Sequence, residues 1–181
     1  MHSGKTTDLV QEIYNLERVG KNVGLYKPRV DTKGGNTIVS QLGYARECDG
    51  VIERLRDWLP EMRTKDYVFV DEAQFMPARD IDMLAQLGVE TTVICYGIRC
   101  DGFQNPWKGS ARLLQIADRL EEFESYCEVC GGKASRNTRF INGVLQTAGQ
   151  QDCIENFDDI SYKCVCTKCW FELKKSSSKS A

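Results

Sequence analysis

Residues 67–75 read Tyr-Val-Phe-Val-Asp-Glu-Ala-Gln-Phe, an apolar run that ends in two adjacent carboxylic acids. Four consecutive apolar residues are typical of a strand buried on both faces of a parallel sheet. A second strand of this kind is predicted at 91–96, and a helix is predicted between the two at 80–87. This alternation of strands and helices indicates an α/β domain built on a parallel sheet.

The remaining residues up to about 125 continue the alternation. Apolar residues recur at helical spacing over 6–19, over 51–59 and from 110 to 123, and strands are expected at 22–26 and 37–42. Pro28 should exclude residues 27–29 from a helix and from a central strand. We therefore expect a parallel sheet with helices on both faces.

The start of the first helix carries a phosphate-binding pattern. Residues 3–6, Ser-Gly-Lys-Thr, match the second half of G-x-x-x-x-G-K-[ST], in which backbone N–H groups surround phosphates. Lys5 would reach the terminal phosphates and the Thr6 hydroxyl would bind Mg²⁺. A Thr-capped helix entry without a ligand is the alternative interpretation. The full pattern begins upstream of Met1, after a strand, so we expect that Met1 is an internal methionine taken as a start or that the gene is truncated.

The acidic pair after residues 67–70 fits the same chemistry. A carboxylate at the end of a buried strand, Asp71, can hold the Mg²⁺ that bridges phosphates, and Glu72 can polarise an attacking hydroxyl or water. A solvated strand end is the alternative. The separation of about 65 residues from the phosphate-binding pattern suits two strands of one sheet, so the two motifs together predict a P-loop NTPase-like (RecA-like) fold.

Cysteines define a second region. Of nine cysteines, six lie in the last third of the chain: Cys127, Cys130, Cys153, Cys164, Cys166 and Cys169. Two Cys-x-x-Cys pairs, at 127–130 and 166–169, can supply four thiolates to a tetrahedral, structural Zn²⁺. Reduced core cysteines are the alternative, and Cys153 and Cys164 are left outside the metal.

An Asn-Gly turn between strand-like residues 139–141 and 143–145 predicts a β-hairpin in this region. We expect a P-loop α/β ATP-binding domain over 1–125, without its first strand. A zinc-ribbon-like domain with a substrate-closing loop should follow over 126–173, and a disordered Lys/Ser tail over 174–181.

Composition narrows the functions further. Lys+Arg 24 against Asp+Glu 26 gives a net charge of −2, which argues against nucleic acid as a partner. No apolar run approaches the length of a membrane helix and no signal peptide is visible, so we expect a cytoplasmic protein without membrane contact. His2 is the only histidine, which excludes a His-based triad. Phe75, Phe103 and Trp107 could sandwich a flat base or could simply pack under a loop.

Several motifs occur together in one order: residues 1–7 (Met-His-Ser-Gly-Lys-Thr-Thr), 27–29 with Asp31, 71–75, 96–99 (Tyr-Gly-Ile-Arg), 109–110 and the two cysteine pairs. With these the chain resembles, from residue 1 to about 171, the zinc-containing thymidine kinases of the cellular (type II) class. The resemblance implies transfer of the γ-phosphoryl group of ATP to the 5′-hydroxyl of thymidine or deoxyuridine, giving the 5′-monophosphate and ADP, with Glu72 as catalytic base.

The resemblance also implies the remaining site residues. The ATP contacts would be Met1, His2, Ser3, Gly4, Lys5, Thr6, Thr7, Asp71, Glu72, Ala73 and Gln74, with Thr6 and Asp71 at the Mg²⁺. The nucleoside pocket would include Phe75, Ile98, Phe103, Trp107 and Tyr162, closed by a loop over about 137–162. Gly102 stands where the family usually has an aromatic residue, with Phe103 displaced by one position.

A homotetramer is implied as well. The other functional class consistent with these residues is a catalytically impaired P-loop and zinc-ribbon protein, either a degenerate kinase or a nucleic-acid adaptor. Glu72 and the pocket aromatics favour the kinase.

Overall fold

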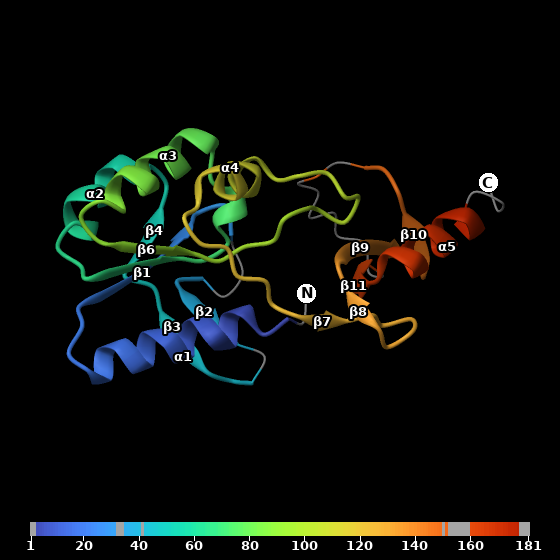
Figure 1. Cartoon of the computed structure of the whole chain (residues 1–181), viewed down its shortest axis with the longest axis horizontal. Coiled ribbons are helices and arrows are strands. Elements are labelled where there is room, and N and C mark those ends of the chain that lie inside the picture. The colour runs from blue at the N-terminus through green and yellow to red at the C-terminus, as the bar shows by residue number, and fades with distance from the viewer. Residues whose placement is uncertain (1–2, 32–34, 41, 150, 152–159, 178–181) are drawn as a thin grey trace. The chain divides into compact units, whose positions relative to one another are not determined.

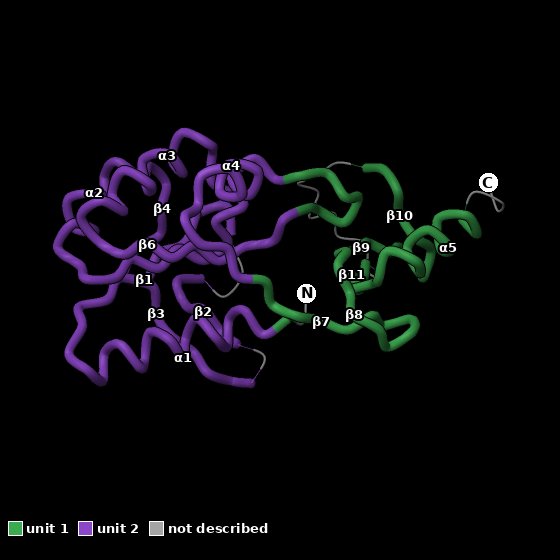
Figure 2. Tube along the Cα trace, in the orientation of Figure 1, with its two compact units in different colours: residues 1–3, 100–106, 122–181 green, residues 4–99, 107–121 purple. Residues whose placement is uncertain are grey.

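The computed structural model describes residues 3–31, 35–40, 42–149, 151 and 160–177, which fall into two compact units (Figure 2). Residues 4–99 and 107–121 form the first, here called the sheet unit. The second, the hairpin unit, contains Ser3, residues 100–106 and the described residues from 122 onward. Among the helices described, none combines the length and apolar character that a membrane span requires.

A four-stranded parallel sheet with the order β4-β1-β5-β6 forms the centre of the sheet unit. Its strands are β1 (Val23–Pro28), β4 (Gly50–Ile52), β5 (Tyr67–Val70) and β6 (Thr92–Cys95). Helix α1 (Lys5–Arg18) covers one face, and α2 (Leu55–Met62), α3 (Ala78–Leu87) and α4 (Lys108–Ile116) lie on the other (Figure 1). A short antiparallel pair, β2 (Thr37–Val39) and β3 (Ala45–Glu47), completes the unit. The predicted α/β fold with helices on both faces is confirmed.

The residues of β5 explain why it is central. Val68, Phe69 and Val70 are each fully buried. Val68 and Val70 join the apolar cluster formed with α2 and α3, while Phe69 stacks against Tyr96 with ring centroids 6.3 Å apart. Both faces of the strand are therefore covered, as its continuous apolar sequence predicts.

Three local predictions are wrong. Residues Val51 and Ile52 do not open a helix but form β4, which pairs with β1, and α2 starts only at Leu55. The helical spacing predicts a helix from 110 to 123, but α4 ends at Ile116 and Leu120 lies beyond it, 58% exposed. Pro28 was expected to exclude residues 27–29 from a central strand, but it is the last residue of the central strand β1. The strand tolerates it because β5 pairs with β1 only as far as Tyr26, so the missing N–H of Pro28 interrupts no bond to β5.

An antiparallel sheet with the order β10-β9-β11 forms the core of the hairpin unit. Its strands are β9 (Arg136–Ile141), β10 (Val144–Gln146) and β11 (Ile160–Val165), accompanied by the pair β7 (Ser125–Tyr126) and β8 (Lys133–Ala134). The predicted Asn-Gly hairpin is confirmed: Asn142 and Gly143 have φ of 49° and 75°, the left-handed conformation that a tight turn of this kind requires.

Helix α5 (Thr167–Ser177) follows β11 in the hairpin unit, where the sequence predicts no helix. The disorder expected from Lys174 onward is wrong for Lys174–Ser177, and residues 178–181 lie outside the described residues. The Lys174 ammonium lies 5.0 Å from the Trp170 ring centroid, one turn earlier, and the hydroxyls of Ser176 and Ser177 donate to carbonyls four residues back. The Lys174–Trp170 contact is a side-chain pair of the i, i+4 kind that supports a helix, whereas the serine hydroxyls only satisfy carbonyls of its last turn.

Candidate functional site

The phosphate-binding pattern lies at the start of α1. Gly4 precedes the helix with φ 81° and ψ 1°, a left-handed conformation that glycine adopts without a steric penalty. The Asp8 N–H donates to the Gly4 carbonyl at 3.0 Å, which closes the first turn. The N–H groups of Lys5, Thr6 and Thr7 have no carbonyl four residues earlier within the helix to which they could donate. They therefore point out of the end of the helix, where they favour a bound anion.

The acidic pair follows β5 at the carboxyl edge of the sheet. Asp71 is 6% exposed, and its Oδ1 accepts the N–H of Glu72 at 2.9 Å. Burial raises the pKa of Asp71 to about 6, and the Glu72 carboxylate adds to this shift. The Glu72 N–H and the Lys5 ammonium act in the opposite direction, so the Lys5 charge is felt at Asp71. The structure thus brings the two sequence motifs to the same edge.

Glu72 is held in an uncommon backbone conformation. Its φ of 51° and ψ of 35° are left-handed, which costs a residue with a side chain about 1–2 kcal/mol. The short helix η1 (Ala73–Phe75) follows, and the side-chain amide of Gln74 donates to Glu72 Oε2. Gln74 Oε1 in turn accepts the N–H of Ile98 at 3.3 Å. The half-buried Glu72 carboxylate is therefore oriented by a buried side chain that is itself tied to the next loop.

Helix α4 supports this loop from the other side. Gly109, in its first turn, packs so closely that a Cβ there would lie 2.4 Å from the carbonyl oxygen of Ala73 and 2.7 Å from that of Met76. The Ser110 hydroxyl donates to the Ile98 carbonyl at 2.6 Å. The backbone on both sides of Gln74 is thus fixed by α4.

Three of the predicted nucleoside residues belong to the sheet unit. Phe75 and Trp107 make an edge-to-face contact with centroids 5.0 Å apart, and Ile98 is half-buried beside the Gln74 amide. The indole N–H of Trp107 is buried and has no hydrogen-bond partner within the described residues. A buried donor of this kind is costly unless a ligand accepts from it.

Phe103 and Tyr162 belong instead to the hairpin unit. Tyr162 pairs with Arg139 across β11 and β9, and the Arg139 guanidinium lies 5.7 Å from the Phe103 ring centroid. A Cβ on Gly102 would lie 2.7 Å from the Arg139 Cβ, which explains why glycine stands there and the aromatic residue comes one position later. Arg139 is only 4% exposed, and no sequence signal indicated that it is buried.

The segment 100–106 is fixed to β9 by further bonds. The Gln104 amide donates to the Asn137 carbonyl at 2.6 Å, and Arg136 donates to Gln104 Oε1 at 3.2 Å. Of the other predicted ATP contacts, Ser3 is assigned to the hairpin unit, and Met1 and His2 lie outside the described residues.

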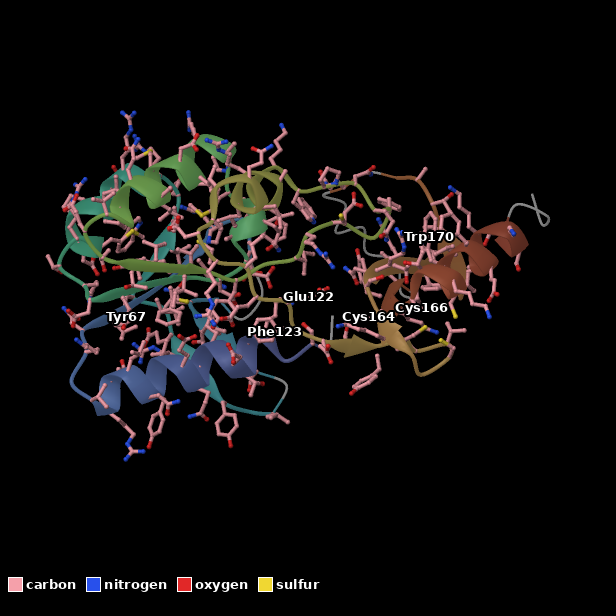
Figure 3. The ribbon with its side chains drawn as sticks, viewed as in Figure 1. Tyr67, Glu122, Phe123, Cys164, Cys166 and Trp170 are labelled. Carbon is pink, nitrogen blue, oxygen red and sulfur yellow. The ribbon has the colours of Figure 1, made fainter. Side chains whose placement is uncertain are left out.

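Four cysteines form the predicted metal centre. The sulfurs of Cys127, Cys130, Cys166 and Cys169 all lie within 4.8 Å of one another, and those of Cys130 and Cys166 are 3.8 Å apart. Sulfurs that bind one tetrahedral Zn²⁺ at about 2.3 Å are about 3.8 Å apart, so the cluster fits zinc. Cys164, near the end of β11, is not part of this group of four. Figure 3 labels Cys164 together with Cys166, which is one of the four.

The surroundings of the cluster favour a thiolate at Cys127, whereas hydrogen bonding to the Cys166 thiol and burial raise the pKa of Cys169. Burial acts to raise the pKa of Cys127, but hydrogen bonds from the backbone of Cys166, Val129 and Cys130 outweigh burial and lower it to about 6. The Cys169 N–H also donates to Cys166 Sγ at 3.4 Å. Four protein ligands leave no open position for a substrate, which indicates a structural zinc.

Sequence reasoning assigned no role to two buried polar groups near the acidic pair. Lys27, at the end of β1, is 1% exposed and lies 3.0 Å from Asp31 Oδ2. Tyr96, directly after β6, is 6% exposed and has its hydroxyl near two carboxylates of α1. Lys27, Asp31 and Tyr96 all belong to the motifs named above, but the partners of Tyr96 are more than 80 residues away in sequence, and no pattern pointed to them.

Comparison with known proteins agrees with this geometry. The thymidine kinase family model matches residues 1–170. A thymidine kinase of Idiomarina loihiensis is 36% identical over 182 residues, covering 95% of this chain and 92% of that protein. One from Chromobacterium violaceum is 35% identical (94% and 93% covered), and one from Enterobacteria phage T4 is 32% identical (97% and 93% covered).

Proposed function

The chain belongs to the thymidine kinase family, and on this premise we propose that it phosphorylates the 5′-hydroxyl of thymidine or deoxyuridine with ATP. The observation that carries the proposal is the Glu72 carboxylate, half-buried in a left-handed turn and oriented by Gln74, next to Asp71 and within the same unit as the phosphate-binding helix start. A general base and an anion site at one sheet edge are what phosphoryl transfer to a hydroxyl requires.

In this proposal Glu72 accepts the proton of the nucleoside 5′-hydroxyl while the hydroxyl oxygen bonds to the γ-phosphorus of ATP. At the same time the bond between the γ-phosphorus and the oxygen of the β-phosphate breaks, and ADP leaves. A positioned base contributes about 10²–10⁴-fold to the rate. Most of the acceleration would therefore come from the groups that hold the phosphates, namely the N–H groups at the start of α1 and the Lys5 ammonium.

Mg²⁺ fits the residues at this edge. Asp71 is a buried carboxylate with a raised pKa, so it gains from a neighbouring cation, and oxygen ligands of the carboxylate and hydroxyl type are those that Mg²⁺ prefers. We propose that Asp71 and Thr6 hold the ion. When bound, Mg²⁺ would neutralise charge on the phosphates.

Phe75, Ile98 and Trp107 are proposed to line the nucleoside pocket in the sheet unit. A role for Phe103 and Tyr162, which belong to the hairpin unit, stays a prediction from the sequence. Zinc would keep the hairpin unit folded, since a structural zinc contributes on the order of 10–16 kcal/mol in small modules. A homotetramer is also part of the proposal, and light scattering on the purified chain would test it.

A coupled assay of ADP release with thymidine, deoxyuridine and deoxycytidine tests the function. We expect turnover with thymidine, and a loss of about 10²–10⁴-fold in kcat for Glu72→Gln with little change in KM for ATP. Glu53→Gln is the matched control, because Glu53 is 70% exposed and pairs with Arg29 on the surface. Absence of turnover, or equal activity in both variants, would refute the proposal.

A further inference from the structure

The Tyr96 side chain links two elements of the sheet unit that are distant in sequence. Its hydroxyl lies 2.8 Å from Asp8 Oδ2 and 2.9 Å from Glu12 Oε2, two carboxylates one turn apart on α1. The ring stacks on Phe69 of β5. Burial, followed by the bonds to these two carboxylates, raises the pKa of Tyr96 far above its ordinary value, so the phenol keeps its proton and acts as a donor.

The Tyr96 backbone makes the second connection. Its N–H donates to the Val70 carbonyl at 2.8 Å, and its carbonyl accepts the N–H of Ala73 at 2.9 Å. These two bonds lie on either side of Asp71 and Glu72. Tyr96 therefore connects two parts of the sheet unit. Its backbone bonds the loop that carries the acidic pair, and its side chain contacts the phosphate-binding helix α1.

Asp8 lies in the first turn of α1, three residues after Lys5. The Asp8 and Glu12 carboxylates share the single proton of the Tyr96 hydroxyl. Because an α-helix moves as a rigid rod, contacts at two residues one turn apart fix both the rotation and the position of the helix start. They also hold the Asp8 carboxylate on the Tyr96 side of a helix end whose N–H groups attract anions.

We propose that Tyr96 is a positioning residue for ATP: its hydroxyl sets the phosphate-binding start of α1 relative to the Asp71–Gln74 loop. The inference rests on the proposed kinase function. Removal of the hydroxyl separates phosphate binding from the geometry of the acidic loop, because it leaves the backbone bonds of Tyr96 to Val70 and Ala73 in place. Glu72 should therefore keep its geometry while the grip on the phosphates weakens.

The chain offers a matched control. Tyr26 is also a buried tyrosine on the sheet, and its hydroxyl donates to a carboxylate, Glu61 Oε1, at 3.0 Å. That bond ties the sheet to α2 instead of α1. Tyr96→Phe and Tyr26→Phe remove the same chemical group from similarly buried sites, so a merely structural role predicts the same consequences for both.

We expect Tyr96→Phe to raise KM for ATP about 10-fold, the lower end for losing a hydrogen bond to a charged group, with KM for thymidine and kcat within about 3-fold. Tyr26→Phe should leave all three constants close to those of the parent chain. Combining Tyr96→Phe with Asp8→Asn should raise KM for ATP no further than Tyr96→Phe alone, because both changes break one contact. The rise in Tm on adding MgATP should likewise be smaller in Tyr96→Phe than in Tyr26→Phe.

Equal effects of the two Tyr→Phe changes on KM for ATP and on the ATP-dependent Tm would overturn the inference and leave the kinase function standing. Absence of phosphoryl transfer in the parent chain would instead refute the kinase function. In that case the difference in ATP-dependent Tm between the two variants still decides the role of Tyr96.

Discussion

The contact of Gly109 with the loop after β5 makes a sharp prediction for Gly109→Ala. The added Cβ would lie 2.4, 2.7 and 2.9 Å from the carbonyl oxygens of Ala73, Met76 and Gln74, whereas ordinary contacts start at 3.4 Å. All three atoms are backbone, so no side chain can rotate away. Either α4 or the loop that carries Glu72 and Gln74 must shift by about 1 Å.

The cost follows from two opposing terms. Overpacking of this kind destabilises by about 1–3 kcal/mol, and replacing a helical glycine by alanine returns about 0.5–1 kcal/mol. We expect a net loss of about 1–2 kcal/mol, which for a chain of this size lowers Tm by roughly 2–8 °C. Because a misplacement of about 1 Å at a reacting group can cost about 10²-fold, kcat should fall by up to that factor.

Differential scanning calorimetry and the ADP-release assay measure both quantities. Gly132→Ala is the control: apart from its chain neighbours, the one atom of the described residues within 4 Å of its added Cβ is Cys130 Sγ at 3.6 Å, an ordinary contact. It should keep both Tm and kcat. A Gly109→Ala protein with unchanged or higher Tm and full activity would show that the loop after β5 is not held by α4 as the structure indicates.

Three further predictions concern the acidic pair, the metal and the pocket. The pKa of Asp71 is raised from 3.8 to about 6, so between these pH values Asp71 is protonated in the native state and ionised in the unfolded state. The free energy of unfolding that this carboxyl contributes is therefore fully present below about pH 4 and is lost as pH rises through 6. In magnesium-free buffer Asp71→Asn should therefore be more stable than the parent by about 2–3 kcal/mol at pH 8 and no more stable at pH 4, as thermal unfolding at the two pH values would show. Metal analysis should find one zinc per chain, which is lost in Cys127→Ser and retained in Cys48→Ser. The fluorescence emission of Trp170 should change only with Cys127→Ser, because Trp170 packs in the same cluster as Cys127. Trp107→Phe removes the five-membered ring of the indole with its buried N–H and keeps one aromatic ring beside Phe75, so KM for thymidine should rise about 10-fold; an unchanged KM would mean that the indole donates nothing to the nucleoside.

Local patterns in the sequence predicted those parts of the structure that depend on neighbouring residues. The continuous apolar run of β5, the Asn-Gly turn and the spacing of Cys127, Cys130, Cys166 and Cys169 each reflect a requirement within a few residues. Strand β4 was missed because Val51 and Ile52 also fit a helical period, and only their pairing with β1, about 25 residues earlier, decides the matter.

The same distinction applies to the site. Asp71 and Glu72 could be found from the end of an apolar strand, whereas the contact of Tyr96 with α1 joins residues 84 and 88 positions apart. The close packing of Gly109 on the Ala73 carbonyl, and the burial of Arg139 behind Phe103, likewise depend on elements brought together only by the fold. No periodicity or spacing reports such contacts.

The membership of residues 100–106 in the hairpin unit determines how the chain can be divided. The polypeptide passes between the two units after residues 3, 99, 106 and 121, so no single cut separates them. A fragment beginning at residue 122 would carry all four cysteines of the cluster but would lack Phe103 and Gln104, leaving the Arg139 guanidinium and the Asn137 carbonyl without these neighbours. Joining residues 100–106 to that fragment through a short linker would provide an isolated module with both contacts restored, suited to NMR study of metal exchange in the absence of the sheet unit.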